Sequence, residues 1–332
     1  MLAFVILIIS IALLFDFLNG MNDAANSVAT VVSTRVLSPH LAVIWAAAFN
    51  LIAAFFFGVH VARTIGMGVI DPSITSPVLI LIALISAVLW THFCTKAGLP
   101  ISVSHALIGG LIGSGIAKAG FQALVVSGVL KICLFIVLSP LIGFLLAMVI
   151  MVVVYRVCRH SNLRKIDVWF RRLQLISAGF YSLAHGTNDA QKTMGVISVL
   201  LYSTGYLGKT FYVPFWVIIS CHLAIAMGTL AGGWKVIETL GMKMTKLKPV
   251  HGFSAETASA AAIIFSSLIG APVSTTHTIT GAIIGVGAVT KFSAIHWGVA
   301  YKIVWTWVLT IPSTALFSAM LWGFASWLHL AR

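Results

Sequence analysis

The sequence contains very little charge and few cysteines. Only 8% of its 332 residues are charged and 60% are hydrophobic, whereas a soluble globular domain carries about 25% charged residues. Most of the surface therefore cannot face water, which excludes soluble enzymes, disordered proteins and ordinary nucleic-acid-binding domains. The four cysteines form no Cys-x-x-Cys pair, so neither a metal site nor a disulfide framework is indicated. The composition predicts an all-α polytopic membrane protein surrounded by the lipid bilayer.

Acidic residues are rarer than basic ones, with seven Asp and Glu against 20 Lys and Arg and a formal net charge of +13. On a soluble protein this excess would indicate nucleic acid. Here the basic residues gather in short polar gaps between apolar runs, above all in 156–172 and 235–248. The positive-inside rule places both gaps in the cytoplasm and predicts a multi-pass protein of the cell's inner (plasma) membrane, with no nucleic acid as a partner.

Apolar stretches predict ten helices, over 2–34, 40–62, 78–95, 100–117, 122–155, 173–201, 211–233, 253–268, 274–290 and 295–328. Two neighbouring pairs are short and meet at Gly98-Leu99-Pro100 and at Gly270-Ala271-Pro272. A helix that breaks at Gly-x-Pro and turns back is typical of a re-entrant hairpin. If 122–155 crosses the membrane once, the N-terminus lies outside; two short spans there would reverse this.

The chain contains an internal repeat. The segment Gly20–Ala24 (GMNDA) recurs as Gly186–Ala190 (GTNDA), and 98–115 recurs as 270–287 with eight of 18 positions identical. An odd number of crossings in each half places the halves in opposite orientations. We therefore expect an inverted repeat with two re-entrant helical hairpins, which is typical of secondary transporters. Its parts are a first repeat over 1–155, a basic cytoplasmic loop over 156–172 and a second repeat over 173–332.

Two of the acids, Asp23 and Asp189, lie at matching positions of the repeated motif, each directly after an asparagine. An ionisable residue at membrane depth is costly and indicates a functional site. Hard monovalent cations prefer carboxylate and amide oxygens. The sequence therefore predicts cation ligands in the two motifs: Asn22, Asp23, Asn26, Asn188 and Asp189.

Two further charged residues are candidates for coupling. Lys192 stands where the first motif has Asn26, so it either binds an anion or neutralises Asp189. Glu256, at the start of the second predicted hairpin, is an interface residue, a cation ligand or a proton carrier. Its repeat counterpart is about Leu84, so Glu256 is not part of a symmetric site.

Hydroxyl side chains follow the break in each hairpin. The candidate substrate-binding residues there are Ser102, Val103 and Ser104 after Pro100, and Ser274, Thr275 and Thr276 after Pro272. These hydroxyls either simply cap a helix or, together with free N–H groups and the positive end of the helix dipole, bind an anion. Two such ends facing one point suit a tetrahedral oxyanion. A nearby carboxylate can accept a hydrogen bond from protonated phosphate but not from sulfate, which favours phosphate.

At these motifs the sequence closely resembles the inorganic phosphate transporter family usually called PiT, which includes bacterial low-affinity phosphate permeases. The motifs that carry the resemblance are GMNDAANSVAT, HGTNDAQKT, LPISVSH and APVSTTH. The resemblance implies a homodimer that moves phosphate with sodium ions or protons and has no covalent cofactor. It implies cation and phosphate binding by Asn22, Asp23, Asn188 and Asp189, and phosphate binding by Ser102, Ser104, Ser274, Thr275 and Thr276. Animal relatives carry an acid where this chain has Asn50.

Three functions remain open from the sequence. The first is a secondary active transporter, not an enzyme, that imports inorganic phosphate in symport with sodium ions or protons by alternating access. The second is a sulfate permease with the same machinery. The third is an intramembrane aspartyl protease that uses Asp23 and Asp189, although the chain lacks the Gly-x-Gly-Asp pattern of that class.

Overall fold

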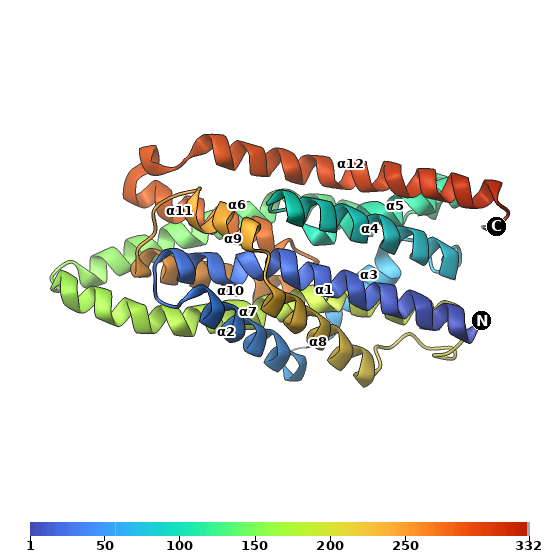
Figure 1. The fold of residues 1–332 in the computed structure, drawn as a ribbon, viewed down its shortest axis with the longest axis horizontal. Coiled ribbons are helices and arrows are strands. Elements are labelled where there is room, and N and C mark those ends of the chain that lie inside the picture. Colours follow the sequence, from blue (N-terminus) through green and yellow to red (C-terminus); the bar gives the residue numbers. More distant parts are fainter. Residues whose placement is uncertain (57, 331–332) are drawn as a thin grey trace.

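The computed structural model describes residues 1–56 and 58–330, and these form a helical bundle (Figure 1). The first half contributes α1 (Leu2–Ser33), α2 (Pro39–Ile52), α3 (His60–Gly68), α4 (Pro77–Ala97), α5 (Val103–Ala119) and α6 (Val126–Cys158). The second half contributes α7 (Leu163–Ser203), α8 (Phe215–Ala231), α9 (Trp234–Met242), α10 (Pro249–Leu268), α11 (Thr275–Lys291) and α12 (Trp297–Trp327). Short 3₁₀ turns lie at Ala53–Phe55, Phe121–Ala123 and Phe292–Ala294. The predicted all-α membrane fold is confirmed.

Four helices, α1, α4, α6 and α12, are long and apolar enough to cross a membrane. Two bent pairs could add one span each: α2 with its 3₁₀ turn and α3, bent by 82°, and α8 with α9, bent by 73°. The long helix α7 does not pass the same test because its middle carries polar side chains. All its residues from Tyr181 to Leu201 are buried, so this part of α7 faces protein and not lipid.

The structure corrects three expected boundaries. The helix expected over 40–62 is interrupted by the bend between α2 and α3, and the helix expected over 211–233 is followed by the bend between α8 and α9. Helix α9 occupies much of the gap 235–248, which was expected to be a loop. The basic segment 156–172 is largely helical, since only four residues separate Cys158 from Leu163. Basic side chains on exposed helix ends produce the same polar gap in a sequence as a loop does. The segment expected over 122–155 is a single helix, α6, with Pro140 inside it.

The ends of the chain give the arrangement of the two halves. Both termini lie at one end of the long axis, and the connection between α6 and α7 lies at the other (Figure 1). The first half of the chain therefore runs from one end of the molecule to the other. This agrees with an odd number of crossings in each half, as an inverted repeat requires.

Each half contains a helical pair at the predicted break. Helix α4 packs against α5, and α10 packs against α11. The pair α4–α5 lies toward the termini, and α10–α11 lies toward the α6–α7 connection (Figure 1). The two pairs thus approach the middle of the molecule from opposite ends, as re-entrant hairpins would.

One helix of each hairpin packs against a long helix of the other half. Helix α5 of the first half packs along α12 of the second, and α11 of the second half packs along α6 of the first. Glycines make the close approach possible: a Cβ at Gly109 or Gly113 would collide with the backbone of α12, and one at Gly281 or Gly285 with the backbone of α6. Small residues at such contacts let membrane helices pack backbone to backbone.

This contact yields a stability prediction. We expect Gly113→Ala to lower the free energy of unfolding by about 1–3 kcal/mol, because the new methyl group collides with the carbonyl oxygen of Ala315. Gly323→Ala is the matched control, since no atom lies within 4 Å of its Cβ position. Thermal unfolding in detergent measures both. Equal melting temperatures for Gly113→Ala and wild type would contradict the prediction.

Candidate functional site

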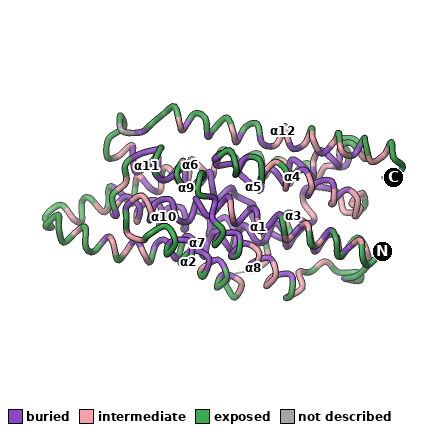
Figure 2. The backbone as a smooth tube through the Cα atoms, viewed as in Figure 1, coloured by how far each residue is buried: buried purple, intermediate pink, exposed green. Residues whose placement is uncertain are grey.

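The buried parts of α1, α7 and α10 meet in the middle of the bundle (Figure 2), and many of the buried residues on these helices are polar. Asp23 on α1 is 2% exposed and Asp189 on α7 is 1% exposed. The hydroxyl-bearing residues Ser104, Thr275 and Thr276 at the starts of α5 and α11 are also buried. The structure therefore brings both repeated motifs and both hairpin ends to one enclosed place.

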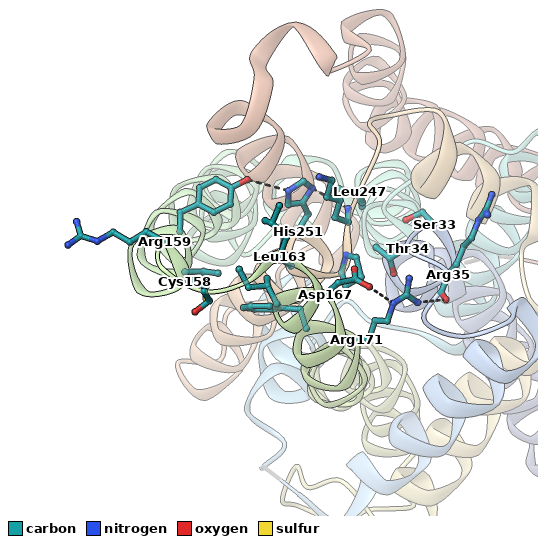
Figure 3. Close-up of a pocket in the computed structure, with 18 residues that line it drawn as sticks. Ser33, Thr34, Arg35, Cys158, Arg159, Leu163, Asp167, Arg171, Leu247 and His251 are labelled. Carbon is teal, nitrogen blue, oxygen red and sulfur yellow. Dashed lines mark hydrogen bonds and ion pairs between the residues drawn. The ribbon is translucent and has the colours of Figure 1, made fainter.

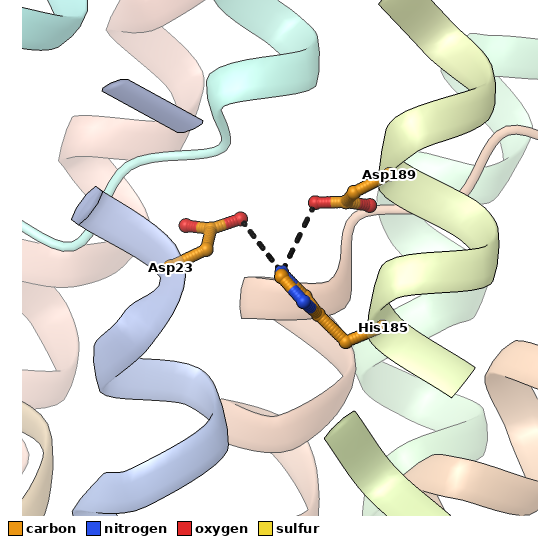
Figure 4. Close-up of side chains that lie close together, drawn as sticks. All are labelled: Asp23, His185 and Asp189. Carbon is orange, nitrogen blue, oxygen red and sulfur yellow. Dashed lines mark ion pairs between the residues drawn. The ribbon is translucent and has the colours of Figure 1, made fainter. Parts of the chain in front are cut away.

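The two carboxylates face each other across a histidine (Figure 4). The Nε2 atom of His185 lies 3.4 Å from Asp189 Oδ2 and 3.7 Å from Asp23 Oδ2. These three ligand atoms lie within 4.8 Å of one another. Sequence reasoning missed His185, although two signals were present: it lies one helical turn before Asp189, and its repeat counterpart is Asn19.

Asn50 orients this histidine. The Asn50 amide donates to Thr229 Oγ1 at 2.9 Å, and its Oδ1 atom lies 3.2 Å from His185 Nδ1. The Nδ1 atom of His185 is thus the donor to Asn50, and Nε2 has no hydrogen-bond partner among the described residues. In the neutral imidazole this leaves a lone pair on Nε2 pointing at two carboxylates, an arrangement that a bound cation or a second proton would stabilise.

Lys192 uses all three of its donors within the protein. Its Nζ atom donates to Asp189 Oδ1 at 2.5 Å, to Ser104 Oγ at 2.5 Å and to the carbonyl oxygen of Val273 at 2.9 Å. An ammonium group has three N–H donors and no acceptor. In this conformation the lysine therefore neutralises Asp189 and ties α7 to both hairpins, and no donor is left for an anion.

The hairpin hydroxyls divide into two roles. Ser102 and Ser274 are N-caps, whose Oγ atoms accept from the N–H groups of His105 at 3.4 Å and His277 at 3.3 Å. Thr275, one residue further, lies 3.2 Å from Asp189 Oδ2 and 3.4 Å from Asp23 Oδ2 and is a donor to either. Its counterpart in the first hairpin, Val103, is buried but carries no hydroxyl.

Thr276 adds a second contact to the first carboxylate. Its hydroxyl lies 3.3 Å from Asp23 Oδ1 and 3.0 Å from the carbonyl oxygen of Ile101, and it accepts from Asn26 Nδ2 at 2.9 Å. The first turn of α11 therefore presents two hydroxyls to the carboxylates. The free N–H groups of the same turn are the donors that an oxyanion would use.

The contacts of the two motifs follow the repeat. Asn22 donates to Thr95 on α4 at 2.8 Å, and Asn188 donates to Ser267 on α10 at 2.8 Å. The Oδ1 atoms of both asparagines are buried and have no hydrogen-bond partner. Buried polar atoms are normally paired. Two amide oxygens without a donor, each next to an aspartate in sequence, are therefore suitable ligands for a cation.

Glu256 lies outside this cluster. It accepts hydrogen bonds from Thr30 at 2.6 Å, from Gln174 at 3.0 Å and from Ser177 at 2.5 Å, and it is fully buried. Gln174 in turn accepts from Thr34 at 2.9 Å. Thr30 and Ser177 lie on α1 and α7, the helices that carry the two aspartates. Glu256 thus lies beside the contact between α1 and α7, but further along these helices than the two aspartates.

Thr34 lines a cavity of about 760 Å³ at the end of the molecule where α6 meets α7 (Figure 3). Several basic side chains line it too, and Arg171 lies between Asp167 at 2.9 Å and the carbonyl oxygen of Arg35 at 3.0 Å. A chain of hydrogen bonds therefore runs from this cavity through Thr34 and Gln174 to Glu256.

The repeated histidines are structural neighbours. The rings of His105 and His277 meet edge to face with centroids 4.7 Å apart, and His277 stacks on Trp307 at 3.7 Å. His277 Nδ1 lies 3.4 Å from the carbonyl oxygen of Ile136 on α6. These contacts join the two hairpins to each other and to the opposite halves.

Comparison with known proteins decides the family. The profile of the Phosphate transporter family matches residues 19–318, a range that contains both motifs and both hairpins. The chain belongs to the phosphate transporter family. Its members are transporters and not enzymes, so the aspartyl protease alternative is wrong.

The phosphate transporter family includes close relatives of this chain. This chain is 56% identical over 321 residues to a probable low-affinity inorganic phosphate transporter of Rhizobium meliloti, and the match covers 96% of each chain. It is 42% identical over 322 residues to a protein of the same description from Bacillus subtilis, again covering 96% of each. A solved structure titled "The sodium-dependent phosphate transporter" matches with a TM-score of 0.88 and 27% identity, covering 98% of this chain and 99% of that one.

Proposed function

We propose that this phosphate transporter imports inorganic phosphate across the cell's inner (plasma) membrane in symport with sodium ions or protons. The observation that carries the proposal is the enclosed cluster in which Asp23, Asp189 and His185 meet the first turn of α11. Cation ligands and oxyanion donors stand side by side there. Such a site binds a cation and an anion together better than it binds either alone.

The charge of the site supports coupling. Asp23 and Asp189 carry two negative charges and Lys192 one positive charge, and all three are buried. Phosphate adds further negative charge, which is costly in a medium of low dielectric constant. Cations held by the aspartates, by the free amide oxygens of Asn22 and Asn188 and by His185 Nε2 would offset it.

The arrangement of the hairpins supports alternating access. The pairs α4–α5 and α10–α11 reach the site from opposite ends (Figure 1), and the site residues between them are buried. Movement of one repeat against the other would open the site to one end at a time. We assign the end that carries the basic segments 156–172 and 235–248 to the cytoplasm, so the cavity that Thr34 lines opens on that side.

Purified protein in liposomes tests the proposal. We expect phosphate to accumulate when a sodium or a proton gradient is imposed, and replacement of sodium by choline at fixed pH identifies the coupling ion. Uptake that ignores both gradients would refute symport. Excess sulfate should leave phosphate uptake unchanged, and strong competition would favour a sulfate permease.

Glu256 yields a coupling prediction. We expect Glu256→Gln to keep gradient-free phosphate exchange while lowering gradient-driven accumulation about tenfold or more, because glutamine keeps the shape but supplies no negative charge to a cation and accepts no proton. Glu238→Gln is the matched control, since Glu238 is 53% exposed and pairs with Lys243 at the surface. Accumulation at the wild-type level by Glu256→Gln would assign Glu256 to packing alone.

The homodimer implied by the family stays a proposal. The outer faces of α6 and α12 carry many exposed apolar side chains, which suit both lipid and a second copy. Mass measurement of the detergent-solubilised protein distinguishes one chain from two.

A further inference from the structure

A buried acid lies outside every motif of the repeat. Asp16 on α1 is fully buried, with an exposed fraction of 0%, and its repeat counterpart is Ser182. Thr193 on α7 donates to Asp16 Oδ1 at 2.8 Å. Its Oδ2 atom is buried and has no hydrogen-bond partner among the described residues, although the side chains of Asn19 and Cys221 lie near the carboxyl group. A carboxylate with so few donors is expensive to keep charged at this depth.

A second acceptor without a donor lies one helical turn further along the same helix. Asn19 is 1% exposed, and in the part of the chain that the structure describes its Oδ1 atom has no hydrogen-bond partner. Residues three apart on a helix share a face. An unmade hydrogen bond at a buried polar atom is costly, so two neighbouring acceptors without donors suit a positively charged ligand.

The position of Asp16 relates it to the central site. Asp16, Asp23 and Thr30 are seven residues apart, so they lie on one side of α1 at steps of about 10 Å. Asp16 contacts Thr193 on α7, and Asp23 lies near His185 on the same helix. Thr30 reaches α7 indirectly, because it donates to Glu256 on α10, which also accepts from Ser177 on α7. Carboxylates therefore occur at three levels of the α1–α7 contact. Glu256 lies on the cavity side of the central pair, and Asp16 on the side of the termini.

We propose that Asp16, Asn19 and Thr193 form a second cation station, between the terminal end of the molecule and the central site, that takes a proton or a sodium ion. A proton on Asp16 Oδ2 turns that atom into a donor toward the free Asn19 oxygen, and a sodium ion uses both oxygens as ligands. The titratable groups that face Asp16 are Cys221 from α8 and Asp189 from α7. This inference rests on the proposed symport, because it assigns a path to the coupling ion.

The test is the number of cations moved per phosphate in proteoliposomes, measured for wild type and for Asp16→Asn. Asparagine has the shape of the protonated acid but cannot exchange the cation. We expect phosphate uptake that is several-fold slower and a cation-to-phosphate ratio lower than wild type. Ser182→Ala, at the matching position of the second repeat, should keep the wild-type ratio. A wild-type ratio in Asp16→Asn would overturn the proposal.

Two further arms make the test decisive. Choline in place of sodium at fixed pH, and a change of pH at fixed sodium, show which of the two dependences Asp16→Asn loses. If Asp16→Asn does not fold, Asn19→Ala keeps the carboxylate and removes the free acceptor. It should raise the half-saturating cation concentration several-fold, and an unchanged value would overturn the proposal. Failure of symport itself would show instead as gradient-independent uptake by the wild type.

Discussion

Replacing Asp23 with asparagine is expected to abolish gradient-driven phosphate uptake and to leave a folded protein. The carboxylate faces His185 and the hydroxyls of Thr275 and Thr276. Asparagine fits the same space, but it removes the charge that would hold a cation. A hydrogen bond to a charged group contributes about 1.5–3 kcal/mol, and a factor of ten corresponds to about 1.4 kcal/mol. Because two such bonds to Asp23 are weakened, uptake should fall at least about 100-fold.

The matching change at Asp189 should have the same effect on transport and a larger one on folding. Asp189→Asn leaves Lys192 without its partner carboxylate, and an unpaired buried charge costs about 3–5 kcal/mol. A double variant that also carries Lys192→Asn replaces the unpaired lysine with the residue that the first repeat has at this position, Asn26. We expect the double variant to regain stability and remain inactive.

Uptake of labelled phosphate and thermal unfolding separate the two effects. Glu238→Gln removes an exposed acid that pairs with Lys243 and should leave both measurements unchanged. Normal uptake by Asp23→Asn and by the double variant would show that the site has been assigned to the wrong residues.

Thr275→Val is expected to cause the second-largest loss, at least about tenfold in phosphate uptake. Thr275 is the one described side chain for which hydrogen bonds to both central carboxylates are found. The loss of a single charge-assisted hydrogen bond accounts for that factor. Valine has nearly the same shape, and the first hairpin already carries it at the matching position, Val103. The fold should therefore be preserved.

The reverse exchange is the control. Val103→Thr gives the first hairpin the hydroxyl of the second and should keep most of the activity, since this position faces no carboxylate in the contacts found. Binding of phosphate to the purified variants, measured by calorimetry, reports the same order. Equal affinity of Thr275→Val and wild type would assign this threonine to helix capping alone.

The sequence was sufficient for the fold class, for the duplication and for most of the residues that meet in the middle. Two copies of one motif leave few alternatives, because an acid within an apolar segment is costly in lipid and indicates a functional site. The sequence also placed Ser102 and Ser274 correctly at helix starts, where they act as caps.

Other features depend on contacts between distant segments. His185 was not predicted as a site residue, because a single histidine on a polar helix face is more often structural, and only the approach of Asp23 from α1 shows its place. Two roles were predicted for Lys192, anion binding or neutralisation of Asp189. Its hydrogen bonds to Ser104 and Val273, which belong to different hairpins, favour the second role in this conformation. The bend after α2 was missed because it lies within one apolar run, and α9 was missed because the lysines of 235–248 indicated a loop.

The packing of helices from one half against helices from the other also constrains how the protein folds during synthesis. Helix α5 cannot bury its glycine face until α12 has left the ribosome, so the first hairpin must wait through the synthesis of the whole chain between Ala119 and Trp297. Contacts between such distant segments form late and slowly. The first half alone would expose backbone to lipid along α5. Each half thus acts as the folding template of the other, and the duplicated copies cannot be separated.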